Sequence, residues 1–413
     1  MILALVFAIG TQAAANMFAL AHQLCTADDG RTWGISLCGP MMFVDPKTHQ
    51  AIANEPVEGA TLDHGLYRFT LGKDVGNANT SLEFQGKRWI MILWPLFGDD
   101  QTHHVILMHE SYHRIQPELH LEGGGGLGTN GYLDDENGRI WLRAEIHALT
   151  AALQASGDAR TRALHDAVAF ARYRWSLFPD AQEQERSLDL NEGLAESTGI
   201  DVGLAPDDRI PYALKDLQLA EQTPSYVRSF PYGIGPGYVE LMDARDPQWR
   251  KDVTNDTNIT LLAASLYGLN VATPSEQQAK TLLASYDGTA ILQQEDARAA
   301  RMAQQRQRYE KEFVGGPVLV LPMKKFSITF NPQDVEQFGD HGSVYHTLQI
   351  TDAWGTLHVD GGDALVSKNF DQVEVPYTGS AASGTGWKLE LTPSYRVTPV
   401  TNSPNSLTVT KGP

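Results

Sequence analysis

The segment HVILMHESYHRIQ, residues 104–116, constrains this chain more than any other feature. Its apolar run has no Gly or Pro until Pro117, which predicts a mostly buried helix that ends before that proline. His109 and His113 lie four residues apart and share one helix face, so both imidazoles can offer a nitrogen to one ion. Glu110 is turned about 100° from His109, which suits a carboxylate that acts on water beside a metal.

This H-E-x-x-H pattern predicts a Zn²⁺ site. The alternative is a pair of histidines with ordinary hydrogen bonds, but two at this spacing around a Glu in an apolar helix favour the metal. A metzincin-like continuation is excluded, because Gln116 and Leu119 occupy the positions of its Gly and third His, and His120 comes one residue late.

Length and charge limit the class of protein. A chain of 413 residues predicts two or three domains. A net charge of −18 argues against nucleic acid or an anionic membrane as a partner. Beyond the N-terminus, no stretch has the apolar length of a membrane span, so we expect no integral membrane segment.

The N-terminal residues 1–15, MILALVFAIGTQAAA, resemble a signal peptide with cleavage near Ala15, although the basic n-region is missing. We therefore expect a secreted or periplasmic protein; the alternative is a buried first helix or strand. Cys25 and Cys38 flank ADDGRTWG, whose Asp-Asp-Gly predicts a turn between two short strands. The two cysteines could form a disulfide across that hairpin or remain two buried thiols.

Periodicity predicts an α+β multidomain architecture. Short apolar runs broken by Gly, Pro and Asn predict a small β-rich N-terminal region over residues 16–100. Helical periodicity then predicts an α-rich, zincin-like catalytic domain over 101–313. Alternating segments over 314–413 predict a C-terminal all-β domain, most simply a sandwich or barrel. The Gly-rich segment 121–138 carries no phosphate-binding pattern; it is either a mobile loop near the metal or merely slack.

The segment DLNEGLAESTG, residues 189–199, offers a third ligand. Glu192 and Glu196 lie four apart on one face of a predicted helix. The segment resembles the Asn-Glu-x-x-x-Asp/Glu helix of gluzincin metallopeptidases such as thermolysin, and its Asn-Glu-Gly-Leu-Ala form resembles the zinc-aminopeptidase branch. This resemblance implies that Glu192 binds zinc and that Glu196 holds a histidine ligand, where a carboxylate fixes the imidazole tautomer.

The resemblance covers only these two short segments. Between His113 and Glu192 lie 78 residues, 114–191, more than those families usually place there. The chain has no Gly-x-Met-Glu-Asn segment of the aminopeptidase kind, so exopeptidase action has no support. Glu145 is the second candidate for the third ligand; its alternative is an ion pair, and the available partners are Arg143, Arg172 and Arg174. The remaining possibility is that neither carboxylate binds.

Stabilisation of an oxyanion needs a further donor. The segment YVRSFPYGIGPGYVELMD supplies Arg228, Tyr232 and Tyr238 beside glycines. Tyr238 is preferred slightly, because Gly-Pro-Gly before an apolar run would place it at the start of a helix.

These observations predict a hydrolase, a zinc metallopeptidase in which His109, His113 and Glu192 bind the metal and Glu110 is the general base toward a peptide or protein substrate. One alternative is a non-catalytic protein that the metal merely stabilises. Another is a binding protein whose β-rich ends contact a glycan or protein partner through aromatic side chains such as Trp354, Tyr377 and Trp387.

Overall fold

The computed structural model describes residues 10–72, 75–76, 78–121, 130–330, 335–380, 382–400 and 403–412. The chain divides into two compact units, Met1–Glu295 and Asp296–Pro413. This division falls inside helix α11 (Gly288–Tyr309) rather than at 313/314, where helical periodicity ends. The reason is that Tyr309 and Phe313 pack with residues of the C-terminal strands.

The first unit begins with helix α1 (Thr11–Asp28) and a six-stranded sheet in the order β3-β4-β2-β1-β6-β5. β1 and β6 pair in parallel and the other neighbours pair antiparallel, so β5 forms one edge. The strands are β1 (Met41–Val44), β2 (Gln50–Ala53), β3 (Thr61–Asp63), β4 (Leu66–Thr70), β5 (Thr80–Phe84) and β6 (Lys87–Leu93).

The hairpin predicted between the two cysteines is wrong. Cys25 lies in the last turns of α1, and Asp29 ends that helix with φ 49° and an amide that donates to the Cys25 carbonyl. Asp-Asp-Gly supplies the left-handed conformation that a helix end and a hairpin turn both need, so the tripeptide alone does not distinguish them. Cys25 and Cys38 do form a disulfide, with Cα atoms 5.1 Å apart, which ties α1 to the segment before β1.

The predicted leader lies largely outside the described residues. Residues 11–15 form the start of α1, where Ala14 is fully buried. Within the described part of the chain, no helix combines the length and apolar character of a membrane span.

The middle of the chain is helical, as predicted. The elements are α2 (Asp100–Ile115), η1 (Gly131–Asp134), α3 (Glu136–Gln154), α4 (Gly157–Leu177), α5 (Ala181–Leu188), the π-helical turn η2 (Asp189–Gly193), α6 (Leu194–Gly203), α7 (Pro206–Gln222), α8 (Pro231–Arg245), η3 (Trp249–Asp252), α9 (Ile259–Leu266) and α10 (Glu276–Leu283). Prolines and glycines in the sequences of α7 and α8 hide their periodicity. Helix α2 ends before Pro117, as predicted.

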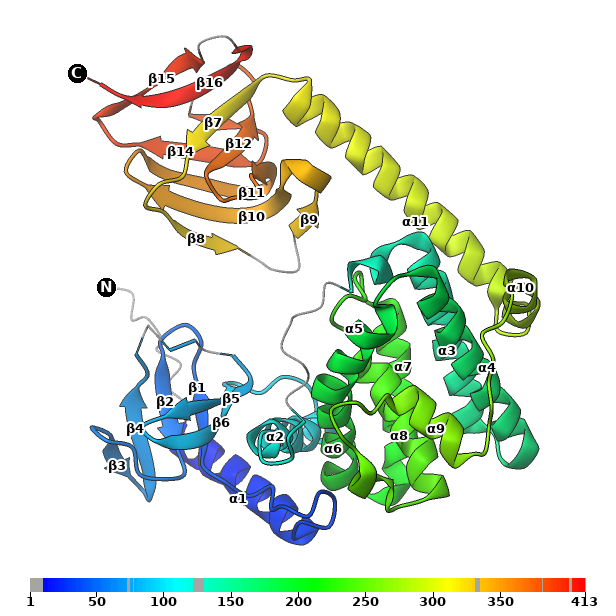
Figure 1. The fold of residues 1–413 in the computed structure, drawn as a ribbon. Coiled ribbons are helices and arrows are strands. Elements are labelled where there is room, and N and C mark those ends of the chain that lie inside the picture. Colours follow the sequence, from blue (N-terminus) through cyan, green and yellow to red (C-terminus); the bar gives the residue numbers. More distant parts are fainter. Residues whose placement is uncertain are drawn as a thin grey trace. The chain divides into compact units, whose positions relative to one another are not determined.

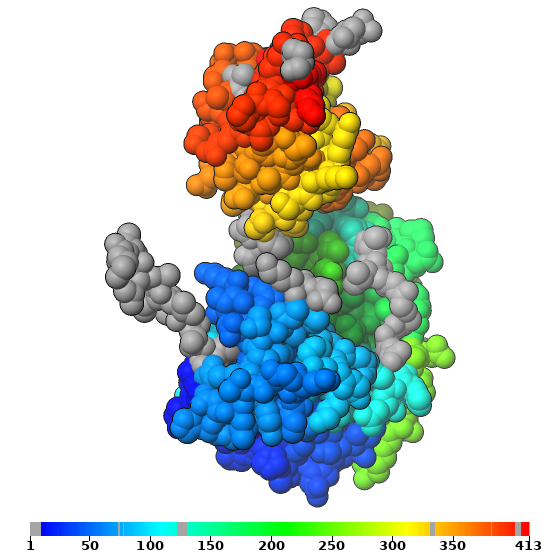
Figure 2. Space-filling view, turned by 90° about the vertical axis from the view of Figure 1, so that its left-hand side faces the viewer, coloured from blue at the N-terminus to red at the C-terminus, as the bar shows by residue number. Residues whose placement is uncertain are grey.

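One hydrophobic core joins the sheet to the helices. Phe18 of α1, Phe43 of β1, Leu107 of α2 and Leu149 of α3 belong to the same buried cluster. In Figure 1, α2 lies between the sheet and α6, and it contacts both. In Figure 2, the N-terminal strands (blue) and the residues that follow them in the sequence (cyan) form one continuous surface. The sheet and the helical region therefore form a single folded body.

The second unit is built from strands, as predicted, with the end of α11 and the turn η4 (Glu310–Val314) packed on them. The path β13-β14-β11-β12-β7-β16-β15 is extended by β10, which pairs with β11, β8 and β9. These strands are β7 (Val318–Pro322), β8 (Ser327–Phe330), β9 (Val335–Gln337), β10 (Ser343–Asp352), β11 (Gly355–Val366), β12 (Gln372–Pro376), β13 (Ser383–Gly384), β14 (Trp387–Leu391), β15 (Tyr395–Val400) and β16 (Ser403–Lys411).

The two tryptophans proposed as a binding platform in this unit are core residues. Trp354 and Trp387 are buried, and their indole N–H groups donate to the carbonyls of Pro322 and Pro376. Tyr377 is half-buried. The two indole rings therefore offer no exposed aromatic surface for a glycan.

Candidate metal centre

Helix α2 presents both histidines from a rigid, buried element. Asp99 caps its N-terminus by accepting a hydrogen bond from the Thr102 amide, and the apolar face carrying Leu107 and Met108 is fully buried. His109 is buried, and His113, one turn later, is partly buried. Because packing holds the helix on two sides, the positions of the two rings are largely set before any ligand binds.

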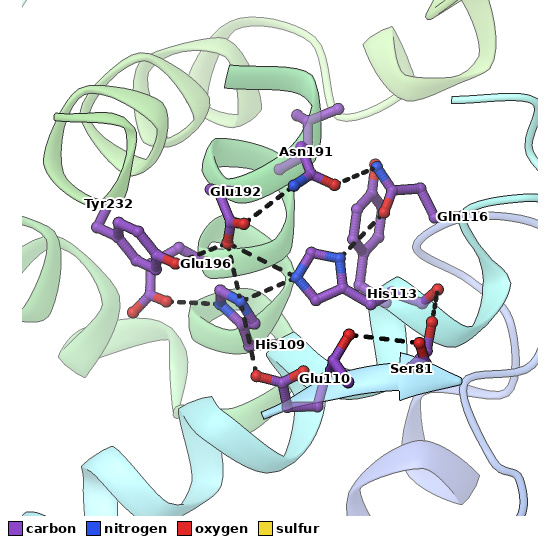
Figure 3. Close-up of polar contacts among 12 residues, drawn as sticks. Ser81, His109, Glu110, His113, Gln116, Asn191, Glu192, Glu196 and Tyr232 are labelled. Atoms are coloured by element: carbon purple, nitrogen blue, oxygen red, sulfur yellow. Dashed lines mark hydrogen bonds and ion pairs between the residues drawn. The ribbon is translucent and has the colours of Figure 1, made fainter. Parts of the chain in front are cut away.

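Three donor atoms converge at one point. Nε2 of His109 lies 3.2 Å from Nε2 of His113, and Oε2 of Glu192 lies 3.5 and 3.7 Å from these two nitrogens. Tetrahedral zinc with ligands at about 2.0–2.1 Å would separate its donors by about 3.4 Å. Figure 3 shows the three side chains pointing toward one another from α2 and η2. Their spacing therefore fits a tetrahedral ion.

The hydrogen bonds of the two Nδ1 atoms determine which nitrogen of each ring carries a proton. Nδ1 of His109 lies 2.7 Å from Oε2 of Glu196, and Nδ1 of His113 lies 3.0 Å from Oε1 of Gln116. Both partners are acceptors, so each Nδ1 carries a proton, and a ring without a second proton turns an unprotonated Nε2 toward the other ring. Two lone pairs 3.2 Å apart would repel, so the pair requires either a proton on one Nε2 or a cation between the two nitrogens.

The orientation of the Gln116 amide is itself fixed. Its Nε2 donates to the Leu121 carbonyl at 2.8 Å and to Oδ1 of Asn191 at 3.1 Å, which leaves Oε1 facing His113. Asn191 in turn donates from Nδ2 to Oε1 of Glu192 at 2.9 Å. This chain of hydrogen bonds connects His113 on α2 to Glu192 on η2, so the two candidate ligands are held in fixed relative positions.

Charge at the centre also favours a cation. Burial lowers the pKa of His109, but hydrogen bonds to Glu192 and Glu196 outweigh it and raise that pKa well above its usual range. For Glu192, burial raises the pKa, while the two histidines lower it by more, so the carboxylate stays ionised. Where the chain alone is present, a proton must supply the positive charge that a metal ion would bring.

Glu110 is placed beside these donors without joining them. Its Oε1 lies 4.0 Å from Nε2 of His109, and its buried Oε2 has no hydrogen-bond partner among the described residues. Burial raises the pKa of Glu110. A carboxyl group with a raised pKa beside the three donor atoms can exchange a proton with a reacting molecule.

Of the candidates for oxyanion stabilisation, the structure brings only Tyr232 to the centre. Its hydroxyl donates to Oε2 of Glu192 at 2.7 Å, and its ring stacks on His109 with centroids 5.8 Å apart. Burial and the Glu192 charge raise the pKa of Tyr232, so the hydroxyl keeps its proton. Arg228 is exposed and is not among the residues that line the surrounding cleft.

Tyr238 and Glu145, both named as candidates from the sequence, lie elsewhere. Helix α8 begins at Pro231, so Tyr238 falls in its interior rather than at its start, and its buried hydroxyl donates to Oε1 of Glu145 at 2.7 Å. Glu145 forms the ion pair considered as its alternative, with Nη1 of Arg174 at 2.7 Å. Two buried groups that satisfy each other are structural, so the preference for Tyr238 as the oxyanion donor was wrong.

The centre lies in a cleft of about 840 Å³. The edge strand β5 contributes Ser81, whose hydroxyl donates to the His113 carbonyl at 2.9 Å. Arg88 of β6 donates to the same hydroxyl at 3.3 Å. A cleft of this volume has room for several residues of a peptide chain.

Sequence reasoning missed Gln116 and Asn191. Gln116 lies three residues after His113 on the same helical face, and Asn191 directly precedes Glu192; both spacings were visible, but neither residue type by itself predicts a role in orienting a ligand. Within the described residues, the other group of possible metal ligands is His22, Cys25 and Cys38, whose sulfur atoms form the disulfide.

Comparison of the chain with protein families, with curated proteins and with solved structures gave no match. The geometry of the centre is therefore the basis for assigning a function.

Proposed function

We propose that this protein is a zinc-dependent peptidase of the gluzincin type. The observation that carries the proposal is the convergence of two imidazole nitrogens and one carboxylate oxygen at 3.2, 3.5 and 3.7 Å from one another. His109, His113 and Glu192 would hold the ion. Zinc in this place would supply Lewis-acid chemistry, which polarises a carbonyl and acidifies water.

The roles of the other residues follow from their positions. Glu110 takes a proton from the attacking water and delivers it to the leaving amine. It lies next to the centre, and its Oε2 has no hydrogen-bond partner among the described residues. Tyr232 holds Glu192 through its hydroxyl and can redirect that donor toward an oxyanion. Glu196 and Gln116 keep the two imidazoles in the tautomer that binds metal.

A metal that only stabilises the fold is the competing interpretation. Structural zinc sites in proteins take four protein ligands. In the described part of the chain, the group around His109 has three such side chains, and it opens into the cleft. The arrangement thus supports a catalytic rather than a closed site.

Export from the cytoplasm remains part of the proposal. A disulfide between Cys25 and Cys38 is the kind of bond that persists in oxidising compartments. Mass spectrometry of the protein recovered from its native cell fraction would give both the N-terminal residue and the state of the two cysteines.

The decisive experiment pairs metal analysis with hydrolysis. Protein purified without added metal should contain one zinc per chain and should cleave members of a peptide library. Glu110→Gln should keep the zinc and the melting temperature while losing activity by about 10²–10⁴-fold. If both proteins hold zinc and neither cleaves any peptide, the site is structural and the proposal fails.

A further inference from the structure

One side of the cleft is formed by helix α7 and the residues around the start of α2. Lys215 of α7 places its Nζ 3.7 Å from Oδ2 of Asp99, so the two segments lie side by side. Residues three or four apart on α7 and at its C-terminal cap share the face that lines the cleft: Tyr212, Asp216, Leu219 and Thr223. We call this part of the cleft the α7 subsite.

The walls of the α7 subsite are apolar at its mouth. Phe97 and Leu219 line it and are 66% and 51% exposed. Ile106 of α2 lines the same cleft and is partly buried. Large apolar side chains that face a cleft gain free energy when a ligand covers them. These walls suit the hydrocarbon part of a substrate side chain.

A carboxyl group lies behind these walls. Asp216 is partly exposed to the cleft, and its buried Oδ2 has no hydrogen-bond partner in the part of the chain that the structure describes. Lys215, its neighbour, directs its ammonium to Asp99 instead. A largely buried carboxyl oxygen without a donor is costly, and a carboxyl group of this kind in a cleft is a candidate for contact with a ligand.

The surroundings of Asp216 favour the protonated form of its carboxyl group. Burial, followed by the charge of Glu196, raises the pKa of Asp216 to about 9, although Lys215 lowers it. The negative charges at this end of the cleft are thus not fully balanced by Lys215, and a further positive charge beside Asp216 would be stabilised. A cation that entered from the cleft would replace the proton held by Asp216.

We propose that the α7 subsite binds a positively charged group of the substrate, with the cation on Asp216 and the hydrocarbon stem along Phe97 and Leu219. Lysine and arginine side chains have this combination of apolar stem and charged end. An N-terminal ammonium group presents the same charge without the stem. The inference rests on the proposed peptidase function, and it adds a substrate class to it.

Binding to the zinc-loaded Glu110→Gln protein tests the inference without turnover. Two peptides with blocked ends would be compared by calorimetry, identical except that one carries lysine where the other carries norleucine, which has a similar stem without charge. A charge-assisted hydrogen bond contributes about 1.5–3 kcal/mol, so the lysine peptide should bind about 10–100-fold more tightly. A third peptide with norleucine and a free N-terminus measures the contribution of an ammonium group.

The variant that decides the role of Asp216 is Asp216→Asn in the same background. It should abolish the preference for lysine over norleucine, whereas the control Lys215→Gln should retain it. If Asp216 only supported the fold, both peptides would weaken together and the ratio of their Kd values would stay unchanged. That result would overturn the inference, as would equal binding of all three peptides to the starting protein.

Hydrolysis of the same peptides by the wild-type protein separates the two proposals. Cleavage of the norleucine and lysine peptides at equal rates, with equal binding, leaves the peptidase and removes the cation subsite. A preference for lysine in binding without cleavage of either peptide removes the peptidase and leaves the cation subsite.

Discussion

Gly235 of α8 packs its backbone directly on the backbone of Gly193 in η2. A Cβ atom on Gly235 would lie 2.4 Å from the Cα of Gly193, a distance that real atoms do not adopt. The close approach brings the first turn of α8 against the turn that carries Glu192. Tyr232 lies in that first turn, and its hydroxyl can therefore reach the Glu192 carboxylate.

Gly235→Ala should push α8 away from η2 and break the contact between Tyr232 and Glu192. We expect a loss of about 1–3 kcal/mol in the free energy of unfolding, together with weaker zinc binding. The control is Gly237→Ala in the same helix, where the new Cβ would meet only side-chain ends, that of Leu149 at 3.3 Å and that of Leu217 at 3.5 Å. Equal stability of the two variants in urea unfolding would contradict this account of the packing.

Gln116→Leu should weaken zinc binding by about 10–100-fold, because Nδ1 of His113 loses its acceptor and the ring loses its fixed tautomer. Competition with a coloured chelator measures the affinity. Glu118→Leu is the matched control. Glu118 lies nearby on the surface, and its one ion pair within the described residues is with Arg114. If both variants bind zinc like the wild type, Gln116 has no role at the centre.

Glu192→Ala and Glu145→Ala should separate the two candidates for the third ligand. Glu192→Ala should lose most of the zinc, since it removes one of three donors. Glu145→Ala should keep the zinc but cost about 3–5 kcal/mol of stability, because Arg174 loses a buried partner. Elemental analysis and unfolding curves give the two results. Loss of zinc in Glu145→Ala alone would reverse the assignment.

Glu240 of α8 predicts a component of stability that depends on pH. Burial, then the charges of Asp201 and Asp243, raise its pKa from 4.5 to about 7, against the opposing effect of Arg209 and Arg250. Between these two values the folded protein holds a proton that the unfolded chain has released. Stability from this group is therefore lost as the pH rises from about 4.5 to about 7.

Glu240→Gln removes this titration, so its stability relative to the wild type should grow across that pH range and stay constant above it. Glu276→Gln is a control of opposite sign: a hydrogen bond from Lys280 lowers the pKa of Glu276, so this substitution should bring no gain. Melting temperatures of the three proteins at several pH values test the expectation. A constant difference between Glu240→Gln and the wild type would show that Glu240 titrates normally.

Local patterns in the sequence were sufficient to predict helix α2 with its two histidines and the change from helices to strands. His109 and His113 are four apart in one helix, so their shared face depends on helix geometry alone. The approach of Glu192 depended on a resemblance, because 78 residues intervene and no local rule brings the two segments together.

The wrong predictions and the missed residues have a common cause: each depends on contacts between segments that are distant in the sequence. Tyr238 was placed at a helix start because Gly-Pro-Gly precedes it, yet α8 begins five residues before Pro236 and simply contains that proline. Asp29 ends a helix where a hairpin turn was expected. The roles of Gln116 and Asn191 arise from partners on other elements, and these partners exist only in the folded chain.

The π-helical turn η2 has a consequence for how this site can change during evolution. Such a turn holds one residue more than an α-helical turn, and it lies directly before α6, which carries Glu196. Removing any one residue from 189–193 would restore the regular repeat and rotate the preceding helix by about 100° relative to α6. Substitutions can accumulate around the centre one at a time, whereas an insertion or deletion in these five positions would separate Glu192 from the histidines in a single step.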